Sequence, residues 1–245
     1  MTEYKFEEND FIGEKTLSVI SEADNFNNWM YQTIKPFCKG RILEIGSGTG
    51  NISKYFIKEN YQIHLSDIRS GYCDNLNKKY KNEPSFLGVK KLDLTDPLFD
   101  SKLSNLTNTF DTVFALNVVE HIKDDELAIS NCYKLLKPGG HLIILVPSYN
   151  VLYNTFDIGL GHFRRYNKKS LEQLFLSSRL KILHKQYFNF IGIFGWFVSG
   201  KILKNDSIPG GQMTFYNRLV PFFKIIDKVI FNAFGLSTFM VAIKE

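Results

Sequence analysis

Short apolar runs alternate with segments of helical spacing along the middle of this chain. Short apolar or alternating runs predict buried strands, and such runs lie at 41–45, 61–66, 86–92, 109–116 and 141–146. Between the strands we expect helices at about 51–59, 70–80 and 125–136. Strands that alternate with helices are typical of a parallel sheet with right-handed crossovers and a helical layer on each face.

Both ends of the chain depart from this alternation. Before the first strand, apolar residues recur at three- and four-residue steps from Phe26 to Phe37, which predicts an amphipathic N-terminal helical cap that Pro36 ends. Lys137–Gly140 reads as a turn. Beyond it we expect a loop at 148–166, a helix at 168–177 capped by Asn167, a strand near 180–188, apolar helices at about 191–204 and 214–234, and a last strand at 238–243.

The most informative stretch is the end of the first predicted strand. Glu44 precedes three alternating glycines, Gly46, Gly48 and Gly50. Glycine allows a tight turn and lets a ligand approach the backbone closely. The spacing is neither that of a dinucleotide fingerprint nor that of a P-loop. A carboxylate at this turn disfavours a pyrophosphate and favours a cationic ligand.

This strand and its E-x-G-x-G-x-G turn resemble the first motif of the class I S-adenosylmethionine (SAM) methyltransferases. Asp67, Asp93 with Leu94, the segment 110–117 followed by Glu120-His121, and the segment 136–147 resemble the companion motifs, in the expected order. The loop around His162 resembles a bacterial subgroup with a GHxRRY-like loop and a Phe/Trp-rich tail, some members of which are linked to surface-glycan assembly. The resemblance covers the sheet well and the substrate end poorly.

The resemblance implies an α/β fold with a three-layer, Rossmann-like sheet. Its seven strands would run in the order 3-2-1-4-5-7-6 with strand 7 antiparallel, together with an N-terminal helical cap and a C-terminal helical insertion. We expect one methyltransferase domain over 1–245. Its parts are a cap at 1–38, a SAM-binding core at 39–147, an acceptor loop and lid helices at 148–236, and a last strand at 237–245.

The resemblance also implies S-adenosylmethionine as the cofactor. The two carboxylate oxygens of Asp67 suit a vicinal ribose diol, although this residue could instead cap a helix. Asp93 would accept from the adenine amine, although it could also belong to an ordinary turn. The full expected set is Glu44, Gly46, Ser47, Gly48, Asp67, Ile68, Asp93, Leu94 and Asn117, with Trp29 and Tyr31 closing over the cofactor from the cap.

Methyl transfer needs a nucleophile aligned within about 3–3.5 Å of the methyl group, and a hydroxyl acceptor needs a base. We expect His162 to be that base, with Asp157 orienting it. His121 has the same chemistry, but it could simply begin a helix. Arg164 and Arg165 can hold an anionic group in bidentate fashion, or they could lie in a solvated turn. Tyr166 and Tyr149 would line the acceptor pocket or serve as packing.

Composition narrows the class of partners. A net charge of +5 without a basic tract does not favour nucleic acid. Cys38, Cys73 and Cys132 are scattered, so we expect no disulfide framework and no metal. The N-terminus does not read as a signal peptide, and no apolar run reaches the length of about 18 residues that spans a bilayer. These features predict a cytoplasmic protein.

The aromatic C-terminal region has two interpretations. Its helices could cover the sheet as a lid over the acceptor, or part of their surface could lie on a membrane with lysines facing anionic headgroups. We therefore expect an enzyme that methylates, preferably on oxygen, a small-molecule, glycan or lipid-linked acceptor, and that makes peripheral contact with the inner face of the membrane if the second interpretation holds. The alternatives are a SAM-fold enzyme of non-methyl chemistry and a non-catalytic SAM-binding partner or sensor subunit. The sequence leaves the oligomeric state open.

Overall fold

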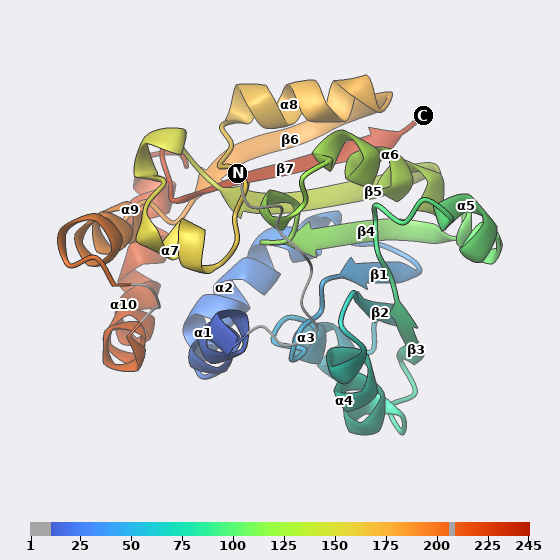
Figure 1. Cartoon of the computed structure of the whole chain (residues 1–245), viewed down its shortest axis with the longest axis horizontal. Coiled ribbons are helices and arrows are strands. Elements are labelled where there is room, and N and C mark those ends of the chain that lie inside the picture. The colour runs from blue at the N-terminus through green and yellow to red at the C-terminus, as the bar shows by residue number, and fades with distance from the viewer. Residues whose placement is uncertain (1–10, 206–208) are drawn as a thin grey trace.

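The computed structural model describes residues 11–205 and 209–245, and its centre is a seven-stranded sheet with helices on both faces (Figure 1). The strand order is β3-β2-β1-β4-β5-β7-β6, and β7 pairs antiparallel with both of its neighbours. The predicted fold class is therefore confirmed. The strands are β1 (Ile42–Ile45), β2 (Ile63–Asp67), β3 (Phe86–Lys91), β4 (Phe110–Leu116), β5 (Leu136–Pro147), β6 (Leu180–Phe188) and β7 (Ser237–Lys244).

The helices fall close to the predicted segments. The α-helices are α1 (Phe11–Ser21), α2 (Asp24–Ile34), α3 (Ser53–Lys58), α4 (Ser70–Tyr80), α5 (Phe99–Lys102), α6 (Asp125–Leu135), α7 (Thr155–Gly159), α8 (Lys168–Ser177), α9 (Gly192–Trp196) and α10 (Gly210–Val229). Shorter 3-10 helices are η1 (Lys35–Phe37), η2 (Ser104–Leu106), η3 (Val119–His121) and η4 (Asn150–Leu152). The segment η5 (Phe197–Ile202) is a π-helix. No helix in the described part of the chain is both long and apolar enough to cross a membrane.

Two apolar cores lie on opposite faces of the sheet. Val113 points to the face covered by α6 and α8, whereas its neighbour Phe114 points to the face covered by α2, α3 and α10. Successive side chains of a strand point to opposite faces. Every residue of β1 and β2 is buried. β1 accordingly reads as a short apolar run, whereas β2 alternates apolar and polar residues although both of its faces are covered.

The structure differs from the prediction at the start of β5. Lys137–Gly140 was expected to be a turn before the strand, but β5 begins at Leu136 and includes this segment. Leu136 pairs with Phe110 and His141 pairs with Thr112, so the four residues form an irregularity within the ladder. A Cβ on Gly140 would lie 3.1 Å from the carbonyl oxygen of Phe110, and glycine permits this close approach.

The expected loop at 148–166 contains the short helices η4 and α7. The predicted N-cap of α8 is confirmed, because the Asn167 side chain accepts from the backbone N–H of Ser170 and the Ser170 hydroxyl accepts in return from the Asn167 N–H. The last long helix runs from Gly210 to Val229 rather than over 214–234, and positive φ angles at Phe231 and Asn232 follow its end.

Candidate active site

A cavity of about 980 Å³ runs along the sheet edge where the parallel strands end. Its walls come from that edge, from the cap helices α1 and α2, from the loop 148–166, and from α9, η5 and α10. In an open α/β sheet this edge is where ligands bind. All nine cofactor residues predicted from the core line the cavity, namely Glu44, Gly46, Ser47, Gly48, Asp67, Ile68, Asp93, Leu94 and Asn117.

The glycine turn after β1 forms a preformed backbone cradle. Gly46 and Gly48 have φ angles of +69° and +51°, a region that side chains disfavour. A Cβ on Gly46 would lie only 2.5 Å from a methyl carbon of Val118. The Ser47 N–H donates to the carbonyl of Ser66 at 2.8 Å, and the Ser66 N–H donates to the Ser47 hydroxyl at 3.2 Å. These bonds fix the turn against β2 before any ligand binds.

Glu44 is a buried carboxyl group at the base of this turn, with 4% of its surface exposed. Its Oε2 accepts a hydrogen bond from the Ser53 hydroxyl. Burial raises the pKa of Glu44 to about 8, against the effect of hydrogen bonds from Ser53 and Ser47, and the nearby charge of Asp67 adds to the rise. The group therefore holds a proton near neutral pH, and a cationic ligand would favour its ionised form.

Asp67 and Asp93 retain acceptor capacity toward the cavity. The Gly48 N–H donates to Asp67 Oδ2 at 2.9 Å, and the Arg69 N–H donates to Oδ1 at 3.0 Å. Each of these carboxylate oxygens can still accept a second donor, as a vicinal diol requires. The N–H and hydroxyl of Thr95 both donate to Asp93 Oδ1. This is the ordinary turn considered for Asp93, and it does not use Oδ2.

The N-terminal cap lines the cavity with other residues than the expected Trp29 and Tyr31. Trp29 packs against Phe188 with ring centroids 4.4 Å apart, and Tyr31 stacks on Tyr55 at 5.2 Å. Neither lines the cavity, whereas Met30 between them does. Successive residues of a helix point about 100° apart, so Trp29 and Tyr31 point away from the direction that Met30 faces. The other cap residues in the lining are Gly13, Thr16, Leu17, Ile20, Phe26 and Asn27.

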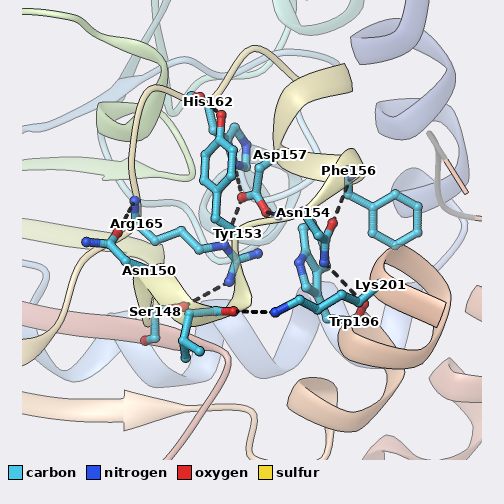
Figure 2. A network of polar contacts seen from close by, with 11 residues as sticks. Ser148, Asn150, Tyr153, Asn154, Phe156, Asp157, His162, Arg165, Trp196 and Lys201 are labelled. Atoms are coloured by element: carbon cyan, nitrogen blue, oxygen red, sulfur yellow. Dashed lines mark hydrogen bonds and ion pairs between the residues drawn. The ribbon is translucent and has the colours of Figure 1, made fainter. Parts of the chain in front are cut away.

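A buried hydrogen-bond network holds His162 at the far end of the cavity (Figure 2). His162 Nδ1 lies 2.8 Å from Asp157 Oδ1, and Arg165 Nε donates to the same oxygen at 2.8 Å. Burial opposes the ionisation of Asp157, but the hydrogen bonds and charges of His162 and Arg165 prevail and lower its carboxyl pKa. Arg165 Nη1 also donates to the carbonyl of Ser148 at 2.8 Å. Asp157 therefore lies behind His162 as an ionised partner and does not line the cavity.

Glu120 and His121 face this histidine. Ligand-type atoms of Glu120, His121 and His162 lie within 4.8 Å of one another, and the two imidazole rings meet edge to face at 4.6 Å. Glu120 is fully buried, and neither of its carboxylate oxygens has a hydrogen-bond partner in the described part of the chain. Burial raises the pKa of Glu120 to about 7, although the charges of His162 and Arg165 oppose the rise. Burial and the charge of His162 lower the pKa of His121 to about 3, so His121 is neutral.

Two hydrogen-bond donors at this end of the cavity also lack a partner among the described residues. They are Arg165 Nη2 and Trp196 Nε1. The guanidinium carbon of Arg165 lies 4.7 Å from the centre of the Trp196 ring, and both residues line the cavity. Unpartnered buried polar groups are costly. Together with Glu120, these groups are suited to a ligand that both donates and accepts hydrogen bonds.

The other predicted acceptor residues lie away from the cavity. Arg164 forms an ion pair with Asp125 at 2.6 Å, and the Tyr166 hydroxyl donates to the same carboxylate at 2.7 Å. Tyr149 packs on Tyr187 with ring centroids 5.0 Å apart. None of the three lines the cavity. Arg164 pairs with Asp125 and Arg165 with the buried Asp157, and of the two arginines only Arg165 lines the cavity.

The sequence interpretation did not assign a role to Glu120. The sequence gives a weak indication of a role for Glu120. Glu120 and His121 lie shortly after the end of β4, and functional residues gather at such strand ends in parallel sheets. The buried Trp196 donor gave no signal, because an aromatic residue within an apolar helix ordinarily reads as packing.

Comparison with known proteins agrees with this geometry. Residues 43–142 match a family model described as a methyltransferase domain. The highly reducing polyketide synthase 40 of Fusarium mangiferae is 31% identical over 104 residues, which is 42% of this chain and 4% of that protein. This chain thus spans only a small fraction of the length of that relative. The residues 43–142 that match the family model include the glycine turn, Asp67, Asp93 and the Glu120-His121 pair.

Solved structures share the fold at low sequence identity. Phosphoethanolamine N-methyltransferase 2 of Haemonchus contortus, in complex with S-adenosyl-L-methionine, aligns with a TM-score of 0.64 and 18% identity over 98% of this chain and 60% of that chain. The CurJ carbon methyltransferase aligns with a TM-score of 0.60 and 14% identity over 97% of this chain and 61% of that chain. The N-terminal cap and the C-terminal helices are therefore included in the shared fold.

Proposed function

We propose that this chain is an S-adenosylmethionine-dependent methyltransferase that methylates a hydroxyl oxygen of its acceptor. The observation that carries this proposal is one continuous cavity with two chemically distinct ends. One end has the glycine turn with Glu44 and Asp67, and the other has the buried Asp157–His162 pair. The methyltransferase domain matched over 43–142 supports the same activity.

The residues around the glycine turn fit the cofactor. When bound, S-adenosylmethionine supplies a methyl group on a positively charged sulfur, with a neutral thioether as the leaving group. Asp67 would accept hydrogen bonds from the ribose hydroxyls, and Asp93 Oδ2 would accept from the adenine amine. Glu44 in its ionised form would stabilise the positive charge, and the backbone of Gly46 and Gly48 would allow close approach.

The residues at the other end remove the acceptor's proton. Asp157 accepts the Nδ1 proton of His162, which leaves Nε2 free to take the proton of a hydroxyl group. Asp157 then stabilises the imidazolium, and the unpartnered carboxylate of Glu120 lies close enough to add to that stabilisation. Arg165 keeps Asp157 ionised and in place. His121 is a much weaker proton acceptor, because burial and the charge of His162 lower its pKa to about 3.

We propose oxygen as the methylated atom because His162 is placed as a base. The similar structures are named as enzymes that methylate nitrogen and carbon, so similarity alone leaves the acceptor atom open. A neutral amine has a lone pair to attack with, whereas a hydroxyl group gains from a base. Methylation of an acidic carbon is the second candidate, because it needs the same base and because relatives of this chain include a polyketide synthase and a carbon methyltransferase.

The test is a screen of hydroxyl-bearing small molecules, glycans and lipid-linked sugars with methyl-labelled S-adenosylmethionine. Calorimetry first measures binding of the cofactor, and mass spectrometry then locates the label in the product. Transfer of the label to oxygen supports the proposal, and transfer to carbon supports the second candidate. Conversion of an acceptor without uptake of the methyl label would identify a non-methyl reaction. Tight cofactor binding without any product would identify a sensor or partner subunit.

A further inference from the structure

Exposed apolar side chains gather on the C-terminal helices. Of the eighteen large apolar residues that are exposed in the described part of the chain, eleven lie between 194 and 234. Figure 1 shows α9 and α10 side by side at one end of the molecule, away from α8 and α5. We call this surface the C-terminal face. Its apolar residues are Phe194, Phe197, Val198, Ile202, Leu203, Phe215, Phe222, Ile225, Val229, Phe231 and Phe234.

The helix α10 has one stripe of buried residues and, on its outer side, one stripe of exposed apolar residues. Its buried residues Met213, Val220 and Asp227 recur every seven positions and face the rest of the protein. Phe215, Phe222 and Val229 recur with the same period and are 64–69% exposed. A helix that packs on its own domain normally presents polar residues on its outer side. Large exposed apolar patches of this kind mark interaction sites.

The charge of the C-terminal face is positive. Lys201, Lys204, Arg218 and Lys228 are exposed among the apolar residues. Within the described residues between 190 and 235 the one acidic residue is Asp227. It is buried and accepts hydrogen bonds from the backbone N–H groups of Asn189 and Phe190. Among its described residues the C-terminal face is therefore apolar and basic with no exposed carboxylate, and such a surface complements an anionic lipid surface.

The cavity opens on this same face. Phe194, Val198 and Phe215 are exposed and also belong to the cavity lining. The α9–η5 segment is tied to the loop that carries His162, because Thr155 Oγ1 donates to the carbonyl of Gly200 at 2.9 Å and Lys201 Nζ donates to that of Val151 at 3.1 Å. The acceptor end of the site is therefore continuous with the exposed apolar surface.

We propose that the C-terminal face lies on an anionic lipid bilayer and that the acceptor is a molecule with an apolar tail that enters the cavity from that surface. The helices would lie in the interface, since none in the described residues can cross it. The apolar wall near His162, which includes Phe156, Leu160 and Met213, then surrounds the part of the acceptor next to its reacting group. The identity of the acceptor rests on the proposed function, whereas the docking of the face does not.

Co-sedimentation of the full chain with lipid vesicles tests the docking. We expect binding to vesicles that contain phosphatidylglycerol, much weaker binding to pure phosphatidylcholine, and weaker binding at high salt. The double substitution Phe222→Gln/Ile225→Gln removes apolar contacts and should weaken binding tenfold or more. Lys204→Ala/Lys228→Ala should weaken it by about fivefold for each charge. The control Leu176→Gln/Leu183→Gln changes two exposed apolar residues on α8 and β6 and should bind as the wild type does.

The outcomes separate this inference from the proposed function. Absence of vesicle binding at low salt, or equal binding by the Phe222→Gln/Ile225→Gln variant, would overturn the docking. Sedimentation velocity of the same proteins detects a further contrary result, namely a dimer that the variant abolishes without any vesicle binding, because the face would then be covered by a second copy. Cofactor affinity measured by calorimetry should be equal in all variants. If the wild type bound vesicles but not the cofactor, the docking would stand and the proposed function would fail.

Discussion

His162 Nδ1 lies 2.8 Å from Asp157 Oδ1, and both side chains are almost fully buried. This one contact determines which imidazole nitrogen faces the cavity. An ionised Asp157 accepts the Nδ1 proton, so Nε2 presents a lone pair toward the acceptor end of the site. The orientation also depends on Arg165, which donates to the same carboxylate oxygen. The geometry of this pair supports the role of base that we propose for His162.

Replacement of His162 should remove the base and leave the cofactor site intact. We expect His162→Gln to lower kcat by about 10²- to 10⁴-fold, with the calorimetric affinity for S-adenosylmethionine within twofold of wild type. His184→Gln is the matched control, because His184 is a half-buried histidine that does not line the cavity. Wild-type turnover in His162→Gln would dismiss this residue as the base.

Asp67→Ala should weaken cofactor binding without unfolding the protein. Asp67 accepts the backbone N–H groups of Gly48 and Arg69 and would accept both ribose hydroxyls. Loss of charge-assisted hydrogen bonds, each worth about 1.5–3 kcal/mol, should reduce the affinity by a hundredfold or more. Titration calorimetry measures the affinity, and circular dichroism checks the fold. Asp74→Ala, an exposed acid on the neighbouring helix α4, should change neither. Unchanged affinity in Asp67→Ala would remove this residue from the ribose role.

Glu44→Gln should stabilise the free protein while it weakens cofactor binding. The folded state raises the pKa of Glu44 to about 8 from the ordinary 4.5. The stability that this group contributes is therefore complete below the unfolded pKa and is lost as the pH rises toward 8. An amide of the same shape has no charge to bury. We expect the variant to be more stable by about 1–3 kcal/mol at pH 8, which is about 2–4 °C in melting temperature for each kcal/mol.

The pH dependence distinguishes this explanation from a general effect of the substitution. The difference in melting temperature between Glu44→Gln and wild type should shrink as the pH falls from 8 to 5. Folded Glu44 keeps its proton over this range, and the free energy needed to protonate it on folding decreases as the pH approaches the unfolded pKa of 4.5. Cofactor affinity of the wild type should rise with pH and level off near 8, where Glu44 ionises unaided. The variant should lack that rise. A melting-temperature difference independent of pH would contradict the role of ionisation.

Much of the sheet and of the cofactor end could be predicted because local signals and tertiary structure agree there. β1 reads as an apolar run and β2 as an alternating one, and α8 begins where Asn167 and Ser170 cap it. The start of β5 was predicted wrongly because Pro138, Gly139 and Gly140 are typical turn residues. Pairing with β4 draws this segment into the strand, and no local pattern encodes that pairing.

The acceptor end was less predictable because it depends on side-chain direction. A sequence cannot tell which of two adjacent arginines faces inward, and Arg165 does so while Arg164 pairs with Asp125. Trp29 and Tyr31 were expected at the cofactor, but the helix turns Met30 toward the cavity instead. Glu120 has a role because a loop some forty residues later brings His162 beside it, and that proximity exists only in the folded chain.

The cluster of Glu120, His121 and His162 also allows a test of metal dependence. The scattered cysteines led us to expect no metal, yet these three side chains offer ligand-type atoms within 4.8 Å of one another. The guanidinium of Arg165 already balances the carboxylate of Asp157, and burial raises the pKa of Glu120 to about 7 and so favours its neutral form, so a cation is not needed for neutrality. We expect turnover to be unaffected by EDTA and the purified protein to contain no stoichiometric metal by mass spectrometry. Added Zn²⁺ should inhibit by occupying His162 Nε2, and EDTA should reverse that inhibition. Activity that a chelator abolishes and a divalent cation restores would make His162 a ligand rather than the base.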